Sequence, residues 1–280
     1  SDGTFDYGGK DSMQAFRDVL LFTLGKNKNT DGNSLSDLSH ISPLSENVGL
    51  YAFSHPGIAA TNVLALYPDE LKDVKYLVGR ENPTIDKISS VEVGHFEDDK
   101  ELLNPFYEYP RDYNSTDLSI DYSSVQYDLS TDTIYFDSNG NGALDSGEYA
   151  LGKRVPQMFG KRFYSVDLTQ ALRDNGLTDA MWPEDIATPE ETKDVWPSLE
   201  TVENYAKLSD LNLHVMLVFA EKDHVQPTLD KPNTHQAYDG FTNADLWVRL
   251  NPDRAYVEAV KKEYGSLAPD NAANTQPSDW

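Results

Sequence analysis

The 280-residue chain contains no cysteine. This absence excludes disulfide bonds, a catalytic thiolate and thiolate-bound zinc, so any catalysis has to use serine, histidine or carboxylate side chains. The cellular compartment stays open on this point, because secreted proteins can lack cysteine as well. A chain of this length can still bury a proper hydrophobic core without covalent crosslinks.

Basic residues are also scarce. Lysine and arginine number 23 against 47 aspartates and glutamates, which gives a formal charge of −24 and a pI near 4.4. The negative electrostatic field of such a chain opposes binding to the phosphates of nucleic acids or to anionic lipids, and we expect no nucleic-acid partner. Cations are the natural small partners. An acidic surface suits an extracellular or saline setting, and it equally serves solubility.

Long hydrophobic runs are missing too. No apolar segment approaches the roughly 20 residues that a bilayer-spanning helix needs, so we expect no membrane span. The chain opens with Ser1, Asp2 and Gly3 instead of a basic and apolar leader. We therefore expect a secreted or surface protein whose signal peptide has been removed.

Short apolar runs alternate with helical patterns. Val48–Phe53 is a strand-length run, Ile58–Leu66 follows with helical character, and Val74–Val78 predicts the next strand. Leu213–Ala220 and Leu246–Leu250 predict two further strands. Nearly continuous apolar strands are typical of parallel sheets buried on both faces. The pattern predicts an α/β fold with a mostly parallel sheet.

The composition and the hydrophobic pattern of the sequence change in the middle of the chain. From about residue 86 to residue 187 the sequence consists of short strand-like pieces rich in tyrosine, serine and aspartate. Helix-start signals return at Thr188, which precedes a proline and a glutamate. We therefore expect a core in two parts, 1–85 and 188–264, with a β-rich insertion or cap at 86–187 and a surface tail at 265–280.

The turn after the first predicted strand carries the first functional motif. Residues 52–57, Ala-Phe-Ser-His-Pro-Gly, resemble the nucleophile elbow of the α/β-hydrolase superfamily, in which a serine occupies a sharp strand-to-helix turn. Ala52 and Pro56 replace the two glycines of that motif, and Gly57 comes one place late. The resemblance implies an α/β-hydrolase type of sheet and Ser54 as the nucleophile. The alternative is an ordinary Ser-x-Pro-Gly turn.

The resemblance also implies an acid and a base. The acid usually follows the penultimate strand, which points to Asp223, and the alternative for Asp223 is a solvated loop carboxylate. The base usually follows the last strand, but Asn251 begins that segment and no histidine comes after His235. Two candidates are left for the base: His235, in the expected chain order and in a predicted loop, and His224, beside the acid. We favour His235.

A second motif lies in the insertion. The twelve residues from Asp137 to Glu148 satisfy the EF-hand loop pattern, which places oxygen ligands for Ca²⁺ around a sharply turned backbone. The flanks at 133–136 and 149–151 look like strands, so the segment resembles the loop alone as found in extracellular proteins. A structural role for the ion is expected, and an Asx-turn hairpin without metal is the alternative. The expected ligands are Asp137, Asn139, Asn141, the carbonyl of Ala143, Asp145 and Glu148.

A partial match to the same EF-hand pattern occurs at residues 27–33. It begins like an EF-hand loop, but Leu38 stands where the closing glutamate belongs. A second calcium site at this segment is left open.

Together these features lead to two hypotheses. The first is a secreted serine hydrolase that cleaves a small or polymeric ester or amide through an acyl-enzyme on Ser54. The second is a calcium-stabilised binding domain that keeps a hydrolase scaffold without catalysis, because a fold alone does not establish activity. The resemblance covers about half of the chain. We expect a preceding segment, a second chain or another copy of this chain to complete the sheet.

Overall fold

The computed structural model describes residues 6, 8–84, 90–97, 100–108, 119–151, 157–158, 161–162, 165–176, 201–219 and 232–251. The chain divides into two compact units. The first, here called the sheet unit, comprises residues 1–84, 197–221 and 233–280. The second, here called the insertion unit, comprises residues 85–196 and 222–232.

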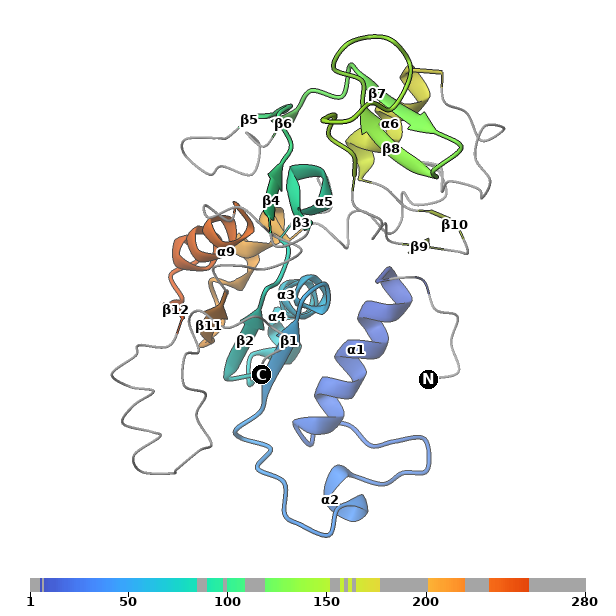
Figure 1. Cartoon of the computed structure of the whole chain (residues 1–280). Coiled ribbons are helices and arrows are strands. Elements are labelled where there is room, and N and C mark those ends of the chain that lie inside the picture. The colour runs from blue at the N-terminus through green and yellow to red at the C-terminus, as the bar shows by residue number, and fades with distance from the viewer. Residues whose placement is uncertain are drawn as a thin grey trace. The chain divides into compact units, whose positions relative to one another are not determined.

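The sheet unit is built on four parallel strands (Figure 1). The strand order is β1 (Gly49–Phe53), β2 (Tyr76–Arg80), β11 (His214–Val218) and β12 (Trp247–Leu250). All three strand pairs are parallel and in register across the sheet. The predicted α/β class with a mostly parallel sheet is therefore confirmed.

Helices precede and connect these strands. They are α1 (Lys10–Thr23), α2 (Leu35–Leu38), α3 (Pro56–Leu66), α4 (Pro68–Leu71), the 3₁₀ helix η2 (Val202–Leu208) and α9 (Pro232–Asn243). Leu64 of α3, Leu208 of η2 and Phe241 of α9 belong to one buried cluster with Leu77 and Val215 of the sheet. The strands advance in one direction across the sheet, and right-handed crossovers then bring successive helices to the same face.

The other face of the sheet carries exposed aromatic residues. Side chains alternate between the two faces along a strand, and Tyr51 (64%), Phe53 (45%), Tyr76 (40%) and Trp247 (53%) retain these exposed fractions. The expectation of strands buried on both faces is therefore wrong for this sheet. The apolar runs led to the wrong prediction because tyrosine and tryptophan count as apolar in a sequence pattern, yet both side chains are stable on a partly solvent-exposed surface.

The strand that leads to Ser54 lies at an edge. Within the described ranges, β1 pairs with β2 alone and β12 forms the opposite edge. The expectation that a further segment, chain or copy completes the sheet stays a prediction.

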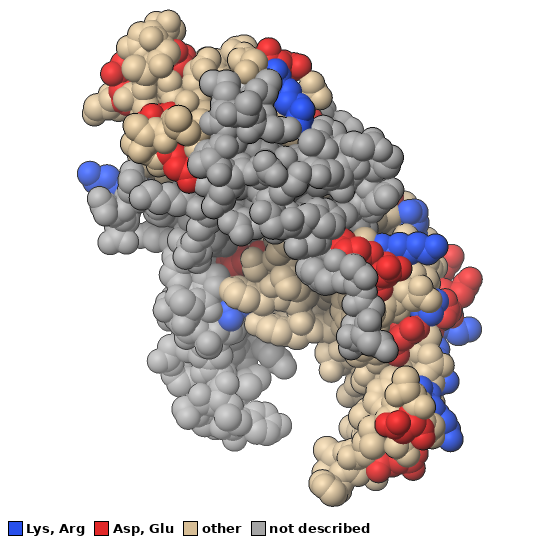
Figure 2. Space-filling model, turned by 90° about the vertical axis from the view of Figure 1, so that its right-hand side faces the viewer, with Lys and Arg blue, Asp and Glu red and all other residues tan. Residues whose placement is uncertain are grey.

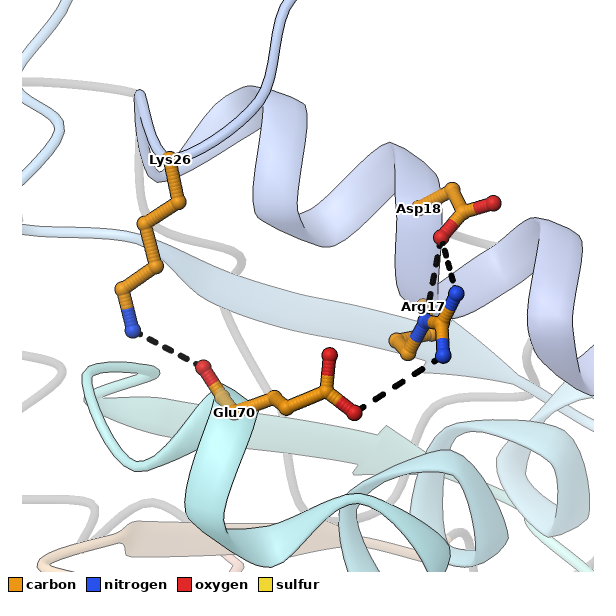
Figure 3. Close-up of polar contacts among 4 residues, drawn as sticks. All are labelled: Arg17, Asp18, Lys26 and Glu70. Carbon is orange, nitrogen blue, oxygen red and sulfur yellow. Dashed lines mark hydrogen bonds and ion pairs between the residues drawn. The ribbon is translucent and has the colours of Figure 1, made fainter.

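Polar contacts join α1 to α4 at the surface of the sheet unit (Figure 3). Arg17 Nη1 lies 3.7 Å from Glu70 Oε1, and Lys26 Nζ donates to the Glu70 carbonyl at 2.8 Å. Lys26 Nζ also lies 2.7 Å from Asp73 Oδ2. Exposed pairs of this kind contribute little to stability, so the buried leucines of α1 hold this helix in place.

Within its described residues, the insertion unit consists of short antiparallel strand pairs and two helices. Its elements are α5 (Ser90–Val93), β3 (Gly94–Glu97) paired with β4 (Lys100–Leu103), β5 (Tyr107–Glu108) with β6 (Ser119–Ile120), β7 (Val125–Asp128) with β8 (Thr133–Phe136), β9 (Gln157–Met158) with β10 (Lys161–Arg162), and α6 (Val166–Asp174).

An aromatic core that encloses the carboxylate of Glu92 holds this unit. Phe136 is fully buried and stacks on Phe106 with ring centroids 5.0 Å apart. Glu92 is also buried and accepts hydrogen bonds from Tyr122 Oη at 2.7 Å and Ser165 Oγ at 2.8 Å. Burial, and then the charge of Glu92, raise the pKa of Tyr122 well above its usual value, so this phenol stays protonated and donates.

Charged groups of both signs share the described surface. On the face that Figure 2 draws, cationic groups are interspersed with acidic ones and form no continuous basic patch over the described residues. None of the helices in the described ranges combines the length and the apolar character that crossing a membrane requires.

Candidate functional site

Ser54 occupies the turn between β1 and α3. Its φ is +58°, in the left-handed region that residues with a Cβ rarely adopt. The Ser54 N–H donates to the Arg80 carbonyl at 2.7 Å, and the Ser54 carbonyl accepts from the Gly57 N–H at 2.9 Å. The side chain is half-buried. The turn therefore has the strained strand-to-helix backbone that a nucleophile elbow requires.

Asn82 lies directly against this turn. Its side chain is buried, and Nδ2 lies 2.7 Å from the Ser54 carbonyl oxygen and 3.1 Å from that of Ala52. Nothing in the sequence around Asn82 marked it, because the contact joins residues 28 positions apart. Sequence reasoning missed this residue.

Two other strands are also followed by left-handed residues at their carboxyl ends, on the side of the sheet where Ser54 follows β1. Glu81 follows β2 with a φ of +48°, and Asn251 follows β12 with a φ of +54°. The Asn251 N–H donates to the Leu217 carbonyl at 2.7 Å, and its Oδ1 accepts from the Phe219 N–H at 2.8 Å. Asn251 thus connects the ends of β11 and β12 through its backbone N–H and its side-chain amide.

Titratable side chains lie near Ser54 in the sequence and on the neighbouring strand. His55 keeps an exposed face, yet desolvation by surrounding atoms lowers the pKa of its imidazole. A lowered pKa keeps this ring neutral at pH 7. Arg80 is buried, and its guanidinium carbon lies 5.1 Å from the centroid of the exposed Phe53 ring. Glu81 is buried beside it in the sequence.

The predicted acid and bases are only partly placed. Asp223 and His224 lie outside the described residues. His235 lies in the first turn of α9, so the loop expected around it is a helix. Pro232 suits a first helical position because its φ is fixed and its missing N–H would be unpaired there. The side chain of His235 is outside the described ones, and its role stays a prediction.

The start of α9 is held by a polar cluster that the sequence did not reveal. Asn233 Oδ1 accepts from the N–H of Thr84 at 3.1 Å and from its Oγ1 at 2.9 Å. Thr84 Oγ1 also approaches Gln236 Oε1, and Thr201 Oγ1 donates to the Thr84 carbonyl. These contacts connect the segment after β2 with α9, and no local spacing predicts them.

The EF-hand-like loop in the insertion unit follows β8. Asp137 is buried, its Oδ1 accepts from the Gly140 N–H at 2.7 Å, and its Oδ2 accepts from the Gly142 N–H at 2.7 Å. Gly140 and Gly142 have φ values of +73° and +74°. The first ligand position therefore organises a tight turn that needs glycine at these two places.

The other ligand positions converge within this turn. The side-chain amides of Asn139 and Asn141 donate to Asp145 Oδ2 at 2.9 and 2.7 Å, and these two bonds lower the pKa of Asp145. Glu148 folds back so that Oε2 accepts from the Asp145 N–H at 3.0 Å and Oε1 from the Ser138 N–H at 2.8 Å. The side chains of Asn139, Asn141, Asp145 and Glu148 are thus joined by hydrogen bonds within one loop.

This donor set fits a hard cation that prefers oxygen ligands. Among the described residues, no group of three or more histidine, aspartate or glutamate side chains is arranged to hold a metal ion. The ligand set expected from the sequence combines three carboxylates with two side-chain amides and one backbone carbonyl. Calcium binding by Asp137, Asp145 and Glu148 stays a prediction.

The weaker loop near the N-terminus forms an Asx turn. Asn29 Oδ1 accepts from the N–H groups of Asp31 at 3.1 Å and Asn33 at 2.8 Å. Ser34 and Asp37 then form the capping box of α2. Leu38, at the closing position, is exposed, so this geometry serves the start of a helix.

Comparisons with known proteins add no relative. A scan against models of protein families, a search of curated proteins and a search of solved structures each returned no match. The function must therefore be inferred from the residues and their geometry.

Proposed function

We propose that this protein is a serine hydrolase of the α/β-hydrolase type that attacks an ester or amide through Ser54. The observation that carries the proposal is the left-handed backbone of Ser54 between β1 and α3. Strained non-glycine residues persist where the surrounding structure fixes them, and they are concentrated at active sites. A serine held in this way directly after a strand presents its hydroxyl at the carboxyl end of the sheet.

The order of the strands supports the same proposal. The carboxyl ends of β1, β2, β11 and β12 share one edge because all four strands are parallel. Ligands of open parallel sheets bind at this edge. Asp223 follows β11 in the chain, so we propose it as the acid that orients the catalytic imidazole.

The proposed chemistry is acyl transfer to Ser54. Oγ attacks the substrate carbonyl while the imidazole of His235, or that of His224, takes the hydroxyl proton. The same imidazole then protonates the leaving alcohol or amine as the tetrahedral intermediate collapses to the acyl-enzyme. Water hydrolyses the ester to Ser54 in the second half-reaction, with the imidazole again acting as base.

An oxyanion donor is available at the start of α3. The N–H groups of Gly57 and Ile58 already donate to the carbonyls of Ser54 and His55. Pro56 has no N–H, and within the described hydrogen bonds the His55 N–H donates to no protein acceptor. The amide of the residue after the nucleophile is a usual oxyanion donor in this superfamily, so we assign His55 to this role.

We further propose that the loop from Asp137 to Glu148 binds one Ca²⁺ and stabilises the insertion unit of a secreted protein. The convergence of Asn139, Asn141 and Asp145 supports this proposal. Bound there, the ion would neutralise carboxylates that otherwise repel one another. Its role would be structural.

The alternative is a calcium-stabilised binding domain without catalysis. Asn251 favours this alternative, since an amide that connects β11 and β12 stands where the superfamily places its base. In this case Ser54 would only shape the turn.

A serine-reactive fluorophosphonate probe tests the two proposals. We expect the probe to label the calcium-supplemented wild-type protein and to leave Ser54→Ala unlabelled, because only an activated hydroxyl attacks phosphorus at a useful rate. Ser209→Ala removes an exposed serine of the same unit and serves as the matched control that should label normally. A folded wild-type protein that takes no label supports the binding domain.

A further inference from the structure

The side chain of Asn82 packs against the turn that holds Ser54. Its Nδ2 lies 3.1 Å from the Ala52 carbonyl oxygen, 2.7 Å from that of Ser54 and 3.2 Å from that of Arg80. The Ala52 and Ser54 carbonyls precede and follow Phe53 in the sequence. The Arg80 carbonyl belongs to β2, the strand next to β1. One amide nitrogen with two hydrogens therefore shares its donors among three carbonyl groups and joins β1, the turn and β2 at a single point.

Two glycines make the space that this side chain occupies. A Cβ at Gly57 would lie 2.1 Å from Asn82 Cγ, and a Cβ at Gly79 would lie 2.3 Å from Asn82 Oδ1. Neither glycine has a left-handed φ, so space and not backbone freedom requires them. Any larger residue at position 57 would therefore displace the Asn82 side chain.

The contacts act on the strained residue itself. The carbonyl of Ser54 belongs to the peptide that enters α3, and it also accepts from the Gly57 N–H. A left-handed non-glycine residue persists only where its surroundings determine the conformation. The buried amide of Asn82 supplies such a determinant, because its loss would leave nearby carbonyls short of a donor.

We propose that Asn82 is a positioning residue that fixes the turn of Ser54 and thereby the direction of its Oγ. The inference rests on the proposed function of Ser54 as the nucleophile. Asn82 does not touch the reacting atoms in this role. Its contribution reaches the reaction through the backbone of the turn.

The first test is Asn82→Asp, which keeps the shape and replaces the donor with an oxygen that faces carbonyl oxygens. We expect the maximal rate of fluorophosphonate labelling to fall about 10- to 100-fold, as for other small misplacements of a reacting group. The apparent affinity for the probe should not change, because the pocket is not altered, and in the uncharged variant Gly79→Ala the pH midpoint of labelling should not change either, because the base is not altered. A generally damaged protein would change these two quantities as well.

Asn204→Asp is the matched control. Asn204 is buried in the same unit, and its Nδ2 donates to Asn62 Oδ1 at 2.9 Å, so the change introduces the same chemistry away from the turn. We expect it to lower stability comparably and to leave the labelling rate within twofold of wild type. A rate loss equal to that of Asn82→Asp would overturn the positioning role.

Gly79→Ala tests the same contact without adding a charge. Its Cβ would displace the Asn82 side chain, so labelling should slow in the single variant. Adding Gly79→Ala to an Asn82→Ala variant should then lower the labelling rate little further, because the Asn82 side chain that Gly79→Ala would displace is already absent. Additive losses, or folded single variants that label at the wild-type rate, would refute the inference.

Failure of the proposed function gives a different result. If the wild-type protein is not labelled at Ser54, the hydrolase proposal fails, and a crystal structure of Asn82→Asp decides the rest. A Ser54 φ that leaves the left-handed region supports the role of Asn82 in the turn. A φ that stays near the wild-type +58° overturns it.

Discussion

Ser54 shows how one residue in an unfavourable conformation is maintained by its neighbours. A left-handed backbone costs a residue with a Cβ about 1–2 kcal/mol, and at Ser54 three backbone or side-chain hydrogen bonds oppose this cost. Asn82 provides one of them, and the peptide groups of Arg80 and Gly57 provide the others. The strain is therefore local and has identified partners.

At the residue scale, the assignment of acid and base is open to a direct comparison. We expect Asp223→Asn to reduce hydrolysis of a short p-nitrophenyl ester by several orders of magnitude, about 10⁴-fold in a related triad, because the imidazole loses its orienting acceptor. His235→Ala and His224→Ala should differ, with only the true base variant inactive. Initial rates at several pH values measure this, and near-full activity in both histidine variants would exclude both residues.

At the scale of elements, the parts of the fold that depend on local pattern were predictable. The apolar run before Ser54 became β1, the helical run after it became α3, and β8 covers the predicted range Thr133–Phe136. These elements follow from hydrophobic periodicity and from turn residues, which are properties of neighbouring positions.

Elements fixed by distant contacts were not predictable in the same way. Residues 232–236 were expected to form a loop because proline and asparagine favour turns. They instead begin α9, where Asn233 and Gln236 bind Thr84, about 150 positions earlier in the chain. The role of Asn82 was hidden for the same reason, since its partners lie on β1 and in the turn.

The calcium loop gives a prediction at this scale. With three carboxylates among the expected ligands, affinity should lie in the weaker extracellular range, with a Kd of about 10⁻⁴–10⁻³ M. Glu148→Gln removes the closing carboxylate and should weaken binding at least tenfold in calorimetric titration. Glu203→Gln, an exposed carboxylate of the other unit, is the control. Equal heats for wild type and Glu148→Gln would contradict the site.

At the scale of the whole molecule, charge and division into units act together. A formal charge of −24 on 280 residues produces self-repulsion that disfavours compact states. A bound divalent cation relieves part of this repulsion in the unit that holds it. The sheet unit has an aliphatic core with Leu64, and the insertion unit has its own core with Phe136 and Leu168.

Separate cores predict separate unfolding transitions, since each domain of a multidomain protein can unfold as its own cooperative unit. Leu64 and Leu168 are both fully buried, and changing either to alanine should destabilise its own unit by about 2–5 kcal/mol. Scanning calorimetry should show Leu64→Ala lowering one transition and Leu168→Ala the other. Chelation of Ca²⁺ should lower only the transition that Leu168→Ala shifts, because an ion bound to the native insertion unit stabilises that unit by mass action. If chelation shifts the transition that Leu64→Ala identifies, or moves neither, then calcium does not act through the loop between Asp137 and Glu148.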